Sequence, residues 1–173
     1  KEESKIFEKI GYTTYSKSGD LYCLFYEVGF NLHDKQGVLT YITSNKWMRA
    51  GYGKNLRKYF KSQTAIQQII DFGDSPIFEN ATTYTNILIG SNDIDSSVKT
   101  SVWDLSVKEP KSFSLRNVLK QNDNFSYVFN LKSYLIIDEN DLKIKKNVEK
   151  IGVPIKDWDL TINRGLITGF NEA

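Results

Sequence analysis

Apolar residues recur at intervals of three and four over residues 20–32, and those intervals place them on one face of a helix. The apolar positions are Leu21, Leu24, Phe25, Val28 and Leu32. The next stretch, GVLTYITS at residues 37–44, is dense in β-branched and aromatic residues. It predicts a buried strand directly after the helix.

The same alternation of element types continues along the chain. Residues 54–62 carry an apolar stripe opposite lysine and arginine, which predicts an amphipathic helix. Residues 65–72, 82–90 and 98–106 are rich in branched apolar residues and predict three strands. The polar loop between the last two strands is short, so we expect these two strands to pair as an antiparallel hairpin.

The order helix, strand, helix, strand, strand is that of the second half of a doubly wound, Rossmann-like α/β sheet. After Pro110 the pattern changes to short strands and a polar helix. We therefore expect two parts. Residues 1–109 form the α/β layer with its antiparallel hairpin, and residues 110–173 form a mixed α+β segment.

Composition narrows the class of protein further. The chain has 173 residues, of which 40% are hydrophobic, which is enough for a packed core. No apolar run is long enough to span a bilayer and the start is charged, so we expect no membrane segment, no signal peptide and a cytoplasmic location. One cysteine and one histidine allow neither an internal disulfide nor a Cys/His zinc site, and we expect no metal.

The first residue is Lys1, and the only methionine is Met48. Removal of the initiator or of a tag would explain this start. The sharper interpretation is that the chain was cut from a larger protein.

Several catalytic motifs are missing. The sequence has no Gly-x-Gly-x-x-Gly and no P-loop, which excludes the nucleotide enzymes that depend on them. Cys23 and His33 are ten positions apart, about 15 Å along one helix, so we interpret Cys23 as a small core residue. Asp71 and Asp74 could mimic a catalytic carboxylate pair, but flanking Gly73 they are more typical of a strand end.

Charge is unevenly distributed. The chain as a whole carries +2, yet the stretch between Asp34 and Asp71 holds no acidic residue. Its basic residues are Lys35, Lys46, Arg49, Lys54, Arg57, Lys58 and Lys61. Interleaved with aromatic residues, such a face suits a nucleic-acid backbone, and a solvated helix surface is the equally good alternative.

Three segments together carry a resemblance. They are SGDLYCLFYEVGFNL, QGVLTYITSNKWMRAGYGKNLRKYF and IDFGDSPIFENATTYTNILIG. In this order they resemble the catalytic domain of gamma-class adenine-specific DNA methyltransferases, most of all TaqI-like enzymes and fused restriction-modification proteins that combine methylase and endonuclease. The tail INRGLITGFNEA resembles the opening of that family's target-recognition domain.

The resemblance implies a chemistry. Such enzymes flip an adenine out of duplex DNA and transfer a methyl group from S-adenosylmethionine to its exocyclic amine. Their Asn-Pro-Pro-Tyr motif and Gly-rich cofactor loop do not occur here, and in the family both lie upstream of this segment. We therefore expect the C-terminal half of a methyltransferase domain, inactive by itself, with no catalytic residue of its own.

The resemblance also implies roles for individual residues. Phe78 matches the aromatic residue that stacks on the flipped adenine. Phe25 matches an apolar wall near the methionine end of S-adenosylmethionine, with a plain core aromatic as the alternative. The expected DNA-binding residues are Lys46, Trp47, Arg49, Lys54, Arg57, Lys58, Arg164 and Thr168. The alternative function is a non-catalytic nucleic-acid-binding module that uses the basic face of residues 35–61.

Overall fold

The computed structural model describes residues 2–34, 36–78, 83–93, 101–104, 114, 116, 126–129, 133–137 and 139–161. The chain divides into two compact units, Lys1–Asp138 and Glu139–Ala173. The boundary expected between residues 109 and 110 falls outside the described residues and stays a prediction. No helix in the described ranges is long and apolar enough to cross a membrane.

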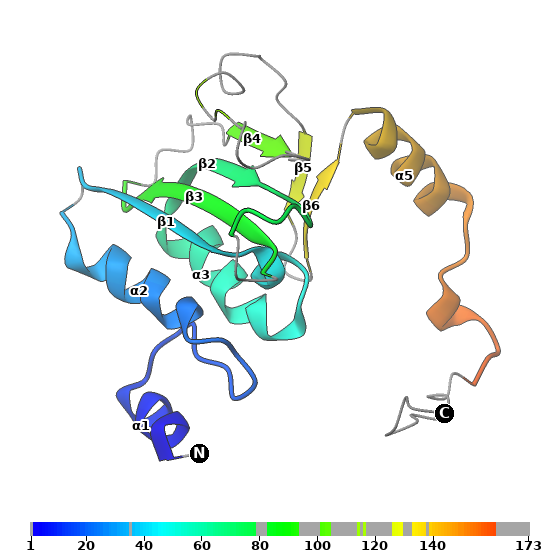
Figure 1. Cartoon of the computed structure of the whole chain (residues 1–173). Coiled ribbons are helices and arrows are strands. Elements are labelled where there is room, and N and C mark those ends of the chain that lie inside the picture. The colour runs from blue at the N-terminus through cyan, green and yellow to red at the C-terminus, as the bar shows by residue number, and fades with distance from the viewer. Residues whose placement is uncertain are drawn as a thin grey trace, which may run out of the picture. The chain divides into compact units, whose positions relative to one another are not determined.

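In the residues that the structure describes, the first unit carries a four-stranded sheet and a two-stranded sheet, with helices beside the larger one (Figure 1). Its helices are α1 (Glu2–Ile10), α2 (Tyr22–Leu32) and α3 (Lys54–Gln63), with short 3-10 turns η1 (Asn45–Met48) and η2 (Gly51–Gly53). Its strands are β1 (Val38–Ser44), β2 (Ala65–Asp71), β3 (Thr85–Ser91), β4 (Ser101–Asp104), β5 (Ser126–Phe129) and β6 (Tyr134–Ile137). The second unit contains α5 (Glu139–Ile151) and the 3-10 turn η4 (Ile155–Asp157).

The strand order in the larger sheet is β1-β3-β2-β4. Strand β3 pairs antiparallel with both β1 and β2, so β1 and β2 run parallel to each other on either side of it. Strand β4 joins the far side of β2 in parallel. The predicted hairpin of the third and fourth strands is therefore wrong, because both edges of β3 are already occupied and β4 adds to β2 instead.

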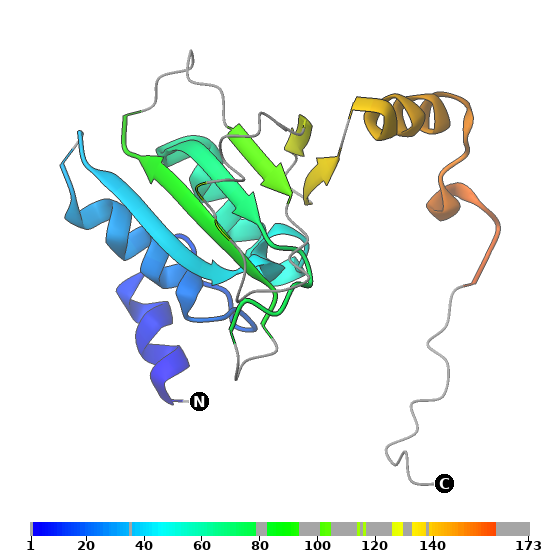
Figure 2. The ribbon, with the colours of Figure 1, turned by 45° about the horizontal axis from the view of Figure 1, so that its top comes forward.

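Helices α2 and α3 cover the same face of this sheet (Figure 2). Phe30 of α2 and Phe60 of α3 are buried with Ile69 of β2 and Leu88 of β3 in one core cluster. The ring of Tyr26 meets that of Phe60 edge to face, with centroids 5.1 Å apart. This burial of aromatic surface is the main source of stability that the fold offers, since each such ring removes a large apolar area from water.

A contact between two aromatic rings attaches the smaller sheet to this core. Tyr134 of β6 is buried and meets Trp47 edge to face, with centroids 5.0 Å apart. Strands β5 and β6 pair antiparallel, and both are short, as the sequence predicted for strands after Pro110. The core of the first unit therefore includes residues from beyond position 110.

At β1 the outer face of the larger sheet is exposed, whereas on β2 the outward-facing Ile70 is 2% exposed. Val38 and Ile42 of β1 project from this face and are exposed. Strand β1 pairs with β3 along one edge, and no described strand pairs with its other edge. A mixed α/β layer with helices on one face is thus what the described residues form.

Candidate nucleic-acid interface

The parallel strands β1 and β2 end at the same edge of the sheet, which we call the carboxyl edge. A hydrogen bond ties the segments that leave these strands. Asn45 Nδ2 donates to Asp71 Oδ1 at 2.7 Å and to the Gly73 carbonyl at 3.2 Å. Asp71 Oδ1 also accepts from the Gly73 amide, and Gly73 has a φ of +55°. Asp71 is buried and Asp74 is exposed, so Asp71 serves the strand end and the two do not form a catalytic pair.

Phe78 lies just beyond this turn and is 45% exposed. Tyr84, which precedes β3 at the same edge, is also exposed, and its carbonyl accepts a hydrogen bond from the Asn45 amide at 2.9 Å. An exposed ring at a sheet edge can serve as a platform for a flat ligand. The sequence did not single out Tyr84, because its pattern predicts a strand over residues 82–90, whereas β3 begins at Thr85.

The basic residues after β1 are exposed at this edge. Lys46 lies in η1, where its amide donates to Ser44 Oγ at 3.3 Å, and Arg49 ends that turn. Lys54 is exposed at the first turn of α3, and Lys58 is exposed one turn later. These four side chains are exposed, and their contacts with DNA stay predictions.

Trp47 and Arg57, which we also expected to bind DNA, are buried instead, so neither side chain is at the surface. Trp47 is 0% exposed, and its Nε1 donates to Asn86 Oδ1 at 3.2 Å. Arg57 is 2% exposed, and its Nη1 donates to the carbonyls of Trp47 and, at 3.0 Å, Ala50. Burial lowers the pKa of the Arg57 guanidinium. Both side chains are committed to the loop that presents Lys46 and Arg49.

Phe25 is 57% exposed, so it is not the core aromatic of the alternative interpretation. Its helix is fixed near the carboxyl edge by two hydroxyl pairs, Tyr22 with Tyr52 at 3.0 Å and Tyr26 with Thr43 at 2.9 Å. Tyr52 belongs to η2 and Thr43 to the end of β1. Phe25 thus projects from the end of α2 that lies closest to this edge.

Two predicted site residues, Arg164 and Thr168, lie outside the described residues, and their DNA contacts stay predictions. In the described ranges no three His, Cys, Asp or Glu side chains gather into a possible metal site. Phe25 is the one described residue for which we expected a cofactor contact.

Comparisons with known proteins point to one class. Residues 1–78 match the sequence model of the Eco57I restriction-modification methylases. The matched segment runs from α1 through Phe78, so it contains most of the carboxyl edge. This part of the chain is therefore similar to a restriction-modification methylase.

Two relatives have names that describe their activity more narrowly. Over 77 residues the chain is 34% identical to the type II restriction enzyme and methyltransferase RM.Eco57I of Escherichia coli, covering 44% of this chain and 8% of that protein. Over 94 residues it is 34% identical to the type II methyltransferase M.BstVI of Geobacillus stearothermophilus, covering 53% of this chain and 17% of that protein. The chain thus spans less than a fifth of the length of either relative.

Solved structures give weaker likenesses. One is described as a class I S-adenosylmethionine-dependent methyltransferase candidate from Listeria monocytogenes, with a TM-score of 0.48, 20% identity, and coverage of 69% of this chain and 36% of that one. Another is the M protein of the type I restriction enzyme EcoKI, with a TM-score of 0.43, 19% identity, and coverage of 56% and 22%. At these scores the likenesses carry no argument about this chain.

Proposed function

We propose that this chain contributes the DNA-facing part of a restriction-modification methyltransferase that methylates the exocyclic amine of adenine in duplex DNA. One observation carries the proposal. The carboxyl edge gathers an exposed aromatic ring, Phe78, and the exposed cations Lys46 and Arg49 within the segment that matches the methylase family. A stacking ring beside phosphate-binding cations is the combination that a flipped base requires.

Each exposed residue has a role in the proposal. Phe78 stacks on the flipped adenine and offsets part of the cost of unstacking it from the duplex. Lys46, Arg49, Lys54 and Lys58 neutralise phosphates on either side of that base. Arg164 and Thr168 begin the target-recognition domain and add contacts to the DNA.

S-adenosylmethionine is the methyl donor in the proposal. The described residues offer Phe25 as an apolar wall but no glycine-rich cradle and no convergent set of polar groups beside it. By themselves they do not make a cofactor site. The open edge of β1 supports a further strand beside it, and the layer would then be the second half of a doubly wound sheet.

A methylation assay with radiolabelled S-adenosylmethionine tests whether the isolated chain is inactive by itself. The isolated chain should transfer no methyl group to duplex DNA, because it holds neither the Asn-Pro-Pro-Tyr motif nor the cofactor loop. Clear turnover by the isolated chain would contradict the proposal.

Binding of DNA tests the surface itself. Replacing Lys46, Lys54 and Lys58 together with alanine should weaken binding and reduce the slope of log K against log salt by about 0.9 for each phosphate that is no longer neutralised. Replacing Lys143, Lys146 and Lys150 of α5 with alanine is the matched control, because it removes the same amount of charge. Equal slopes for the two triple variants would mean that the basic residues are only solvated surface.

A non-catalytic nucleic-acid-binding module is the second candidate, favoured by the four exposed cations alone. The two candidates differ at Phe78. With 2-aminopurine at the target position, base flipping gives a fluorescence rise that Phe78→Ala should change. A module that only holds phosphates predicts the same fluorescence and affinity with and without this substitution.

A further inference from the structure

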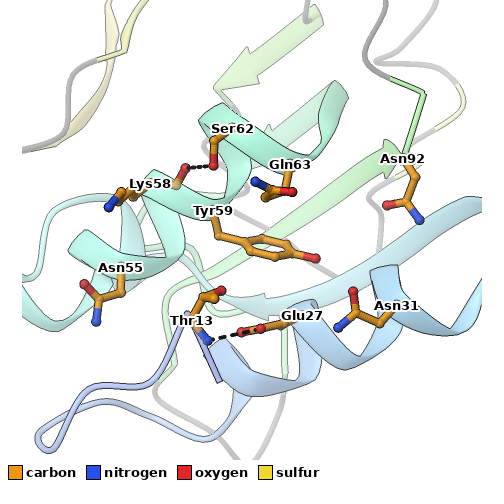
Figure 3. A pocket seen from close by; sticks show the side chains of 9 residues that line it. All are labelled: Thr13, Glu27, Asn31, Asn55, Lys58, Tyr59, Ser62, Gln63 and Asn92. Atoms are coloured by element: carbon orange, nitrogen blue, oxygen red, sulfur yellow. Dashed lines mark hydrogen bonds between the residues drawn. The ribbon is translucent and has the colours of Figure 1, made fainter. Parts of the chain in front are cut away.

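A pocket of about 680 Å³ lies between α2 and α3, on the helix-covered side of the sheet. Its walls are polar. On α3 the lining residues Asn55, Lys58, Tyr59 and Ser62 recur at intervals of three and four, which places them on one helix face (Figure 3). Glu27 lines it from α2. Lys58 and Ser62 are exposed at the rim of the pocket, whereas Glu27 and Tyr59 are buried in its wall.

Glu27 is 6% exposed and its carboxylate is held by a turn. Oε1 accepts from the Thr13 amide at 3.1 Å, and Oε2 accepts from the Thr14 amide and hydroxyl at 2.8 and 2.9 Å. A carboxylate has about four acceptor positions, so one on Oε1 is left over. Among the described residues no lysine, arginine or histidine forms an ion pair with Glu27. A buried carboxylate without a cation is costly unless something compensates its charge.

Tyr59 lies across the floor of the pocket, and its hydroxyl points into it (Figure 3). The residue is 8% exposed, and within the described part of the chain its hydroxyl has no hydrogen-bond partner. Burial, and to a smaller extent the charge of Glu27, raises the pKa of Tyr59. The phenol therefore presents its hydroxyl beside a carboxylate that accepts three hydrogen bonds but has no ion pair with a described lysine, arginine or histidine.

Two carboxamides add further acceptors. Asn55 Nδ2 donates to the Tyr15 carbonyl, and Asn92 Nδ2 donates to the Phe30 carbonyl at 2.6 Å. Asn92 Nδ2 also donates to the His33 carbonyl at 3.4 Å, whereas Asn55 has a second N–H, and the Oδ1 atom of each carboxamide can accept a hydrogen bond from a ligand. The pocket thus combines a carboxylate with several neutral acceptors.

We propose that this pocket binds an organic cation carrying a guanidinium or primary ammonium group. A guanidinium can donate to Glu27 Oε1, to the Tyr59 hydroxyl oxygen and to a carboxamide oxygen. The ligand chemistry is the same for a small free cation and for the arginine side chain of a peptide. The proposal is independent of methyl transfer.

Lys58 is the charged group that opposes such a ligand, because it lines the pocket on α3 and is exposed. The carboxylate is buried and close to the ring, whereas the ammonium of Lys58 can turn toward water. The charge of Lys58 thus opposes a cation in the pocket, whereas in the proposed DNA surface the same charge favours binding. Lys58→Ala should strengthen cation binding and weaken DNA binding.

The test is a titration of the chain, followed by amide NMR, with methylguanidinium as the small cation and a blocked Ala-Arg-Ala peptide as the side-chain source. Shifts should concentrate at Glu27, Tyr59 and Asn55. Neutral methylurea and inorganic phosphate are the matched probes that should not bind. Tighter binding of the peptide than of methylguanidinium identifies a protein segment as the source, and equal or weaker binding identifies a free cation.

Variants separate recognition from folding. Glu27→Gln should reduce affinity at least about tenfold, since a charge-assisted bond is removed. Tyr59→Phe keeps the ring and should reduce affinity by about 2- to 10-fold with an unchanged amide spectrum. Lys58→Ala should raise affinity severalfold. If Glu27→Gln does not fold, the affinities of Tyr59→Phe and Lys58→Ala serve as the test. Unchanged affinity in both of these variants overturns the proposal. Equal binding of methylurea, or binding of phosphate in place of the cations, overturns it as well.

Discussion

Trp47 and Arg57 hold the loop after β1 from inside. The indole Nε1 donates to Asn86 Oδ1, and the Arg57 guanidinium donates to the Trp47 carbonyl. Phe60 and Tyr134 pack against the indole ring, with centroids 5.1 and 5.0 Å away. A buried donor that loses its partner costs more than the bond itself contributes, so these residues define the loop rather than the surface.

Trp47→Phe removes the indole donor and part of the buried ring. We expect a loss of roughly 1–3 kcal/mol in the free energy of unfolding. Trp158 is exposed, with its Nε1 donating to the Val153 carbonyl, and Trp158→Phe should change stability by about 0.5 kcal/mol or less. Urea denaturation followed by circular dichroism measures both. Similar losses in the two variants would contradict the anchoring role of Trp47.

Cys23 is buried in α2, and burial raises the pKa of its thiol to about 12. The thiolate is the reactive form, so the thiol should stay inert in the folded chain at pH 8. Because it is the only cysteine, a thiol reagent such as DTNB reports on it alone. We expect labelling in guanidinium chloride to be at least about 100-fold faster than labelling of the native chain. Rapid native labelling would show that this part of α2 is accessible.

At the scale of elements, the turns η1 and η2 connect β1 to α3 and place Lys46 and Arg49 at the carboxyl edge. Their close packing depends on a glycine. A Cβ at Gly53 would lie 2.1 Å from the Trp47 carbonyl oxygen and 2.8 Å from Arg57 Nη1. No rotation of a side chain relieves a clash with backbone, so the turn must deform if any other residue stands there.

Gly53→Ala should therefore destabilise the chain by about 1–3 kcal/mol and weaken DNA binding through the displaced loop. Gly51→Ala is the matched control, because a Cβ there meets nothing within 4 Å. Thermal unfolding measures the stability of both variants, and a DNA-binding isotherm measures their affinity. A stable Gly53→Ala variant with normal DNA affinity would show that the loop does not need this close approach.

The elements show which features the sequence could predict. The spacing of Leu24, Leu56 and Ile69 with their neighbours was sufficient for α2, α3 and β2, because periodicity is a local property. The pairing of β4 with β2 was not predictable, since it depends on which strand edge remains open. The burial of Trp47 and Arg57 was missed for a similar reason. A basic or aromatic residue looks the same in the sequence whether its side chain binds DNA or hydrogen-bonds to its own chain.

For the whole molecule, the division after Asp138 places Tyr134 in the first unit, where it packs on Trp47. The described part of the second unit exposes most of its side chains. The first unit should therefore fold without the second, whereas a cut at the boundary predicted from the sequence removes part of the core.

Two truncations test this organisation. A chain ending at Asp138 should keep a cooperative thermal transition close to that of the full chain. A chain ending at residue 109 lacks Tyr134 together with β5 and β6, and its midpoint should fall by about 5 °C or more. Equal midpoints would support the boundary between residues 109 and 110.

The open edge of β1 has a consequence for the chain in solution. With Val38 and Ile42 exposed beside backbone groups that no described strand occupies, this strand offers both hydrogen bonds and apolar surface to a second copy. A strand edge of this kind favours edge-to-edge association and, at high concentration, precipitation. We therefore expect a charged residue in place of Val38 or Ile42 to raise the solubility of the isolated chain.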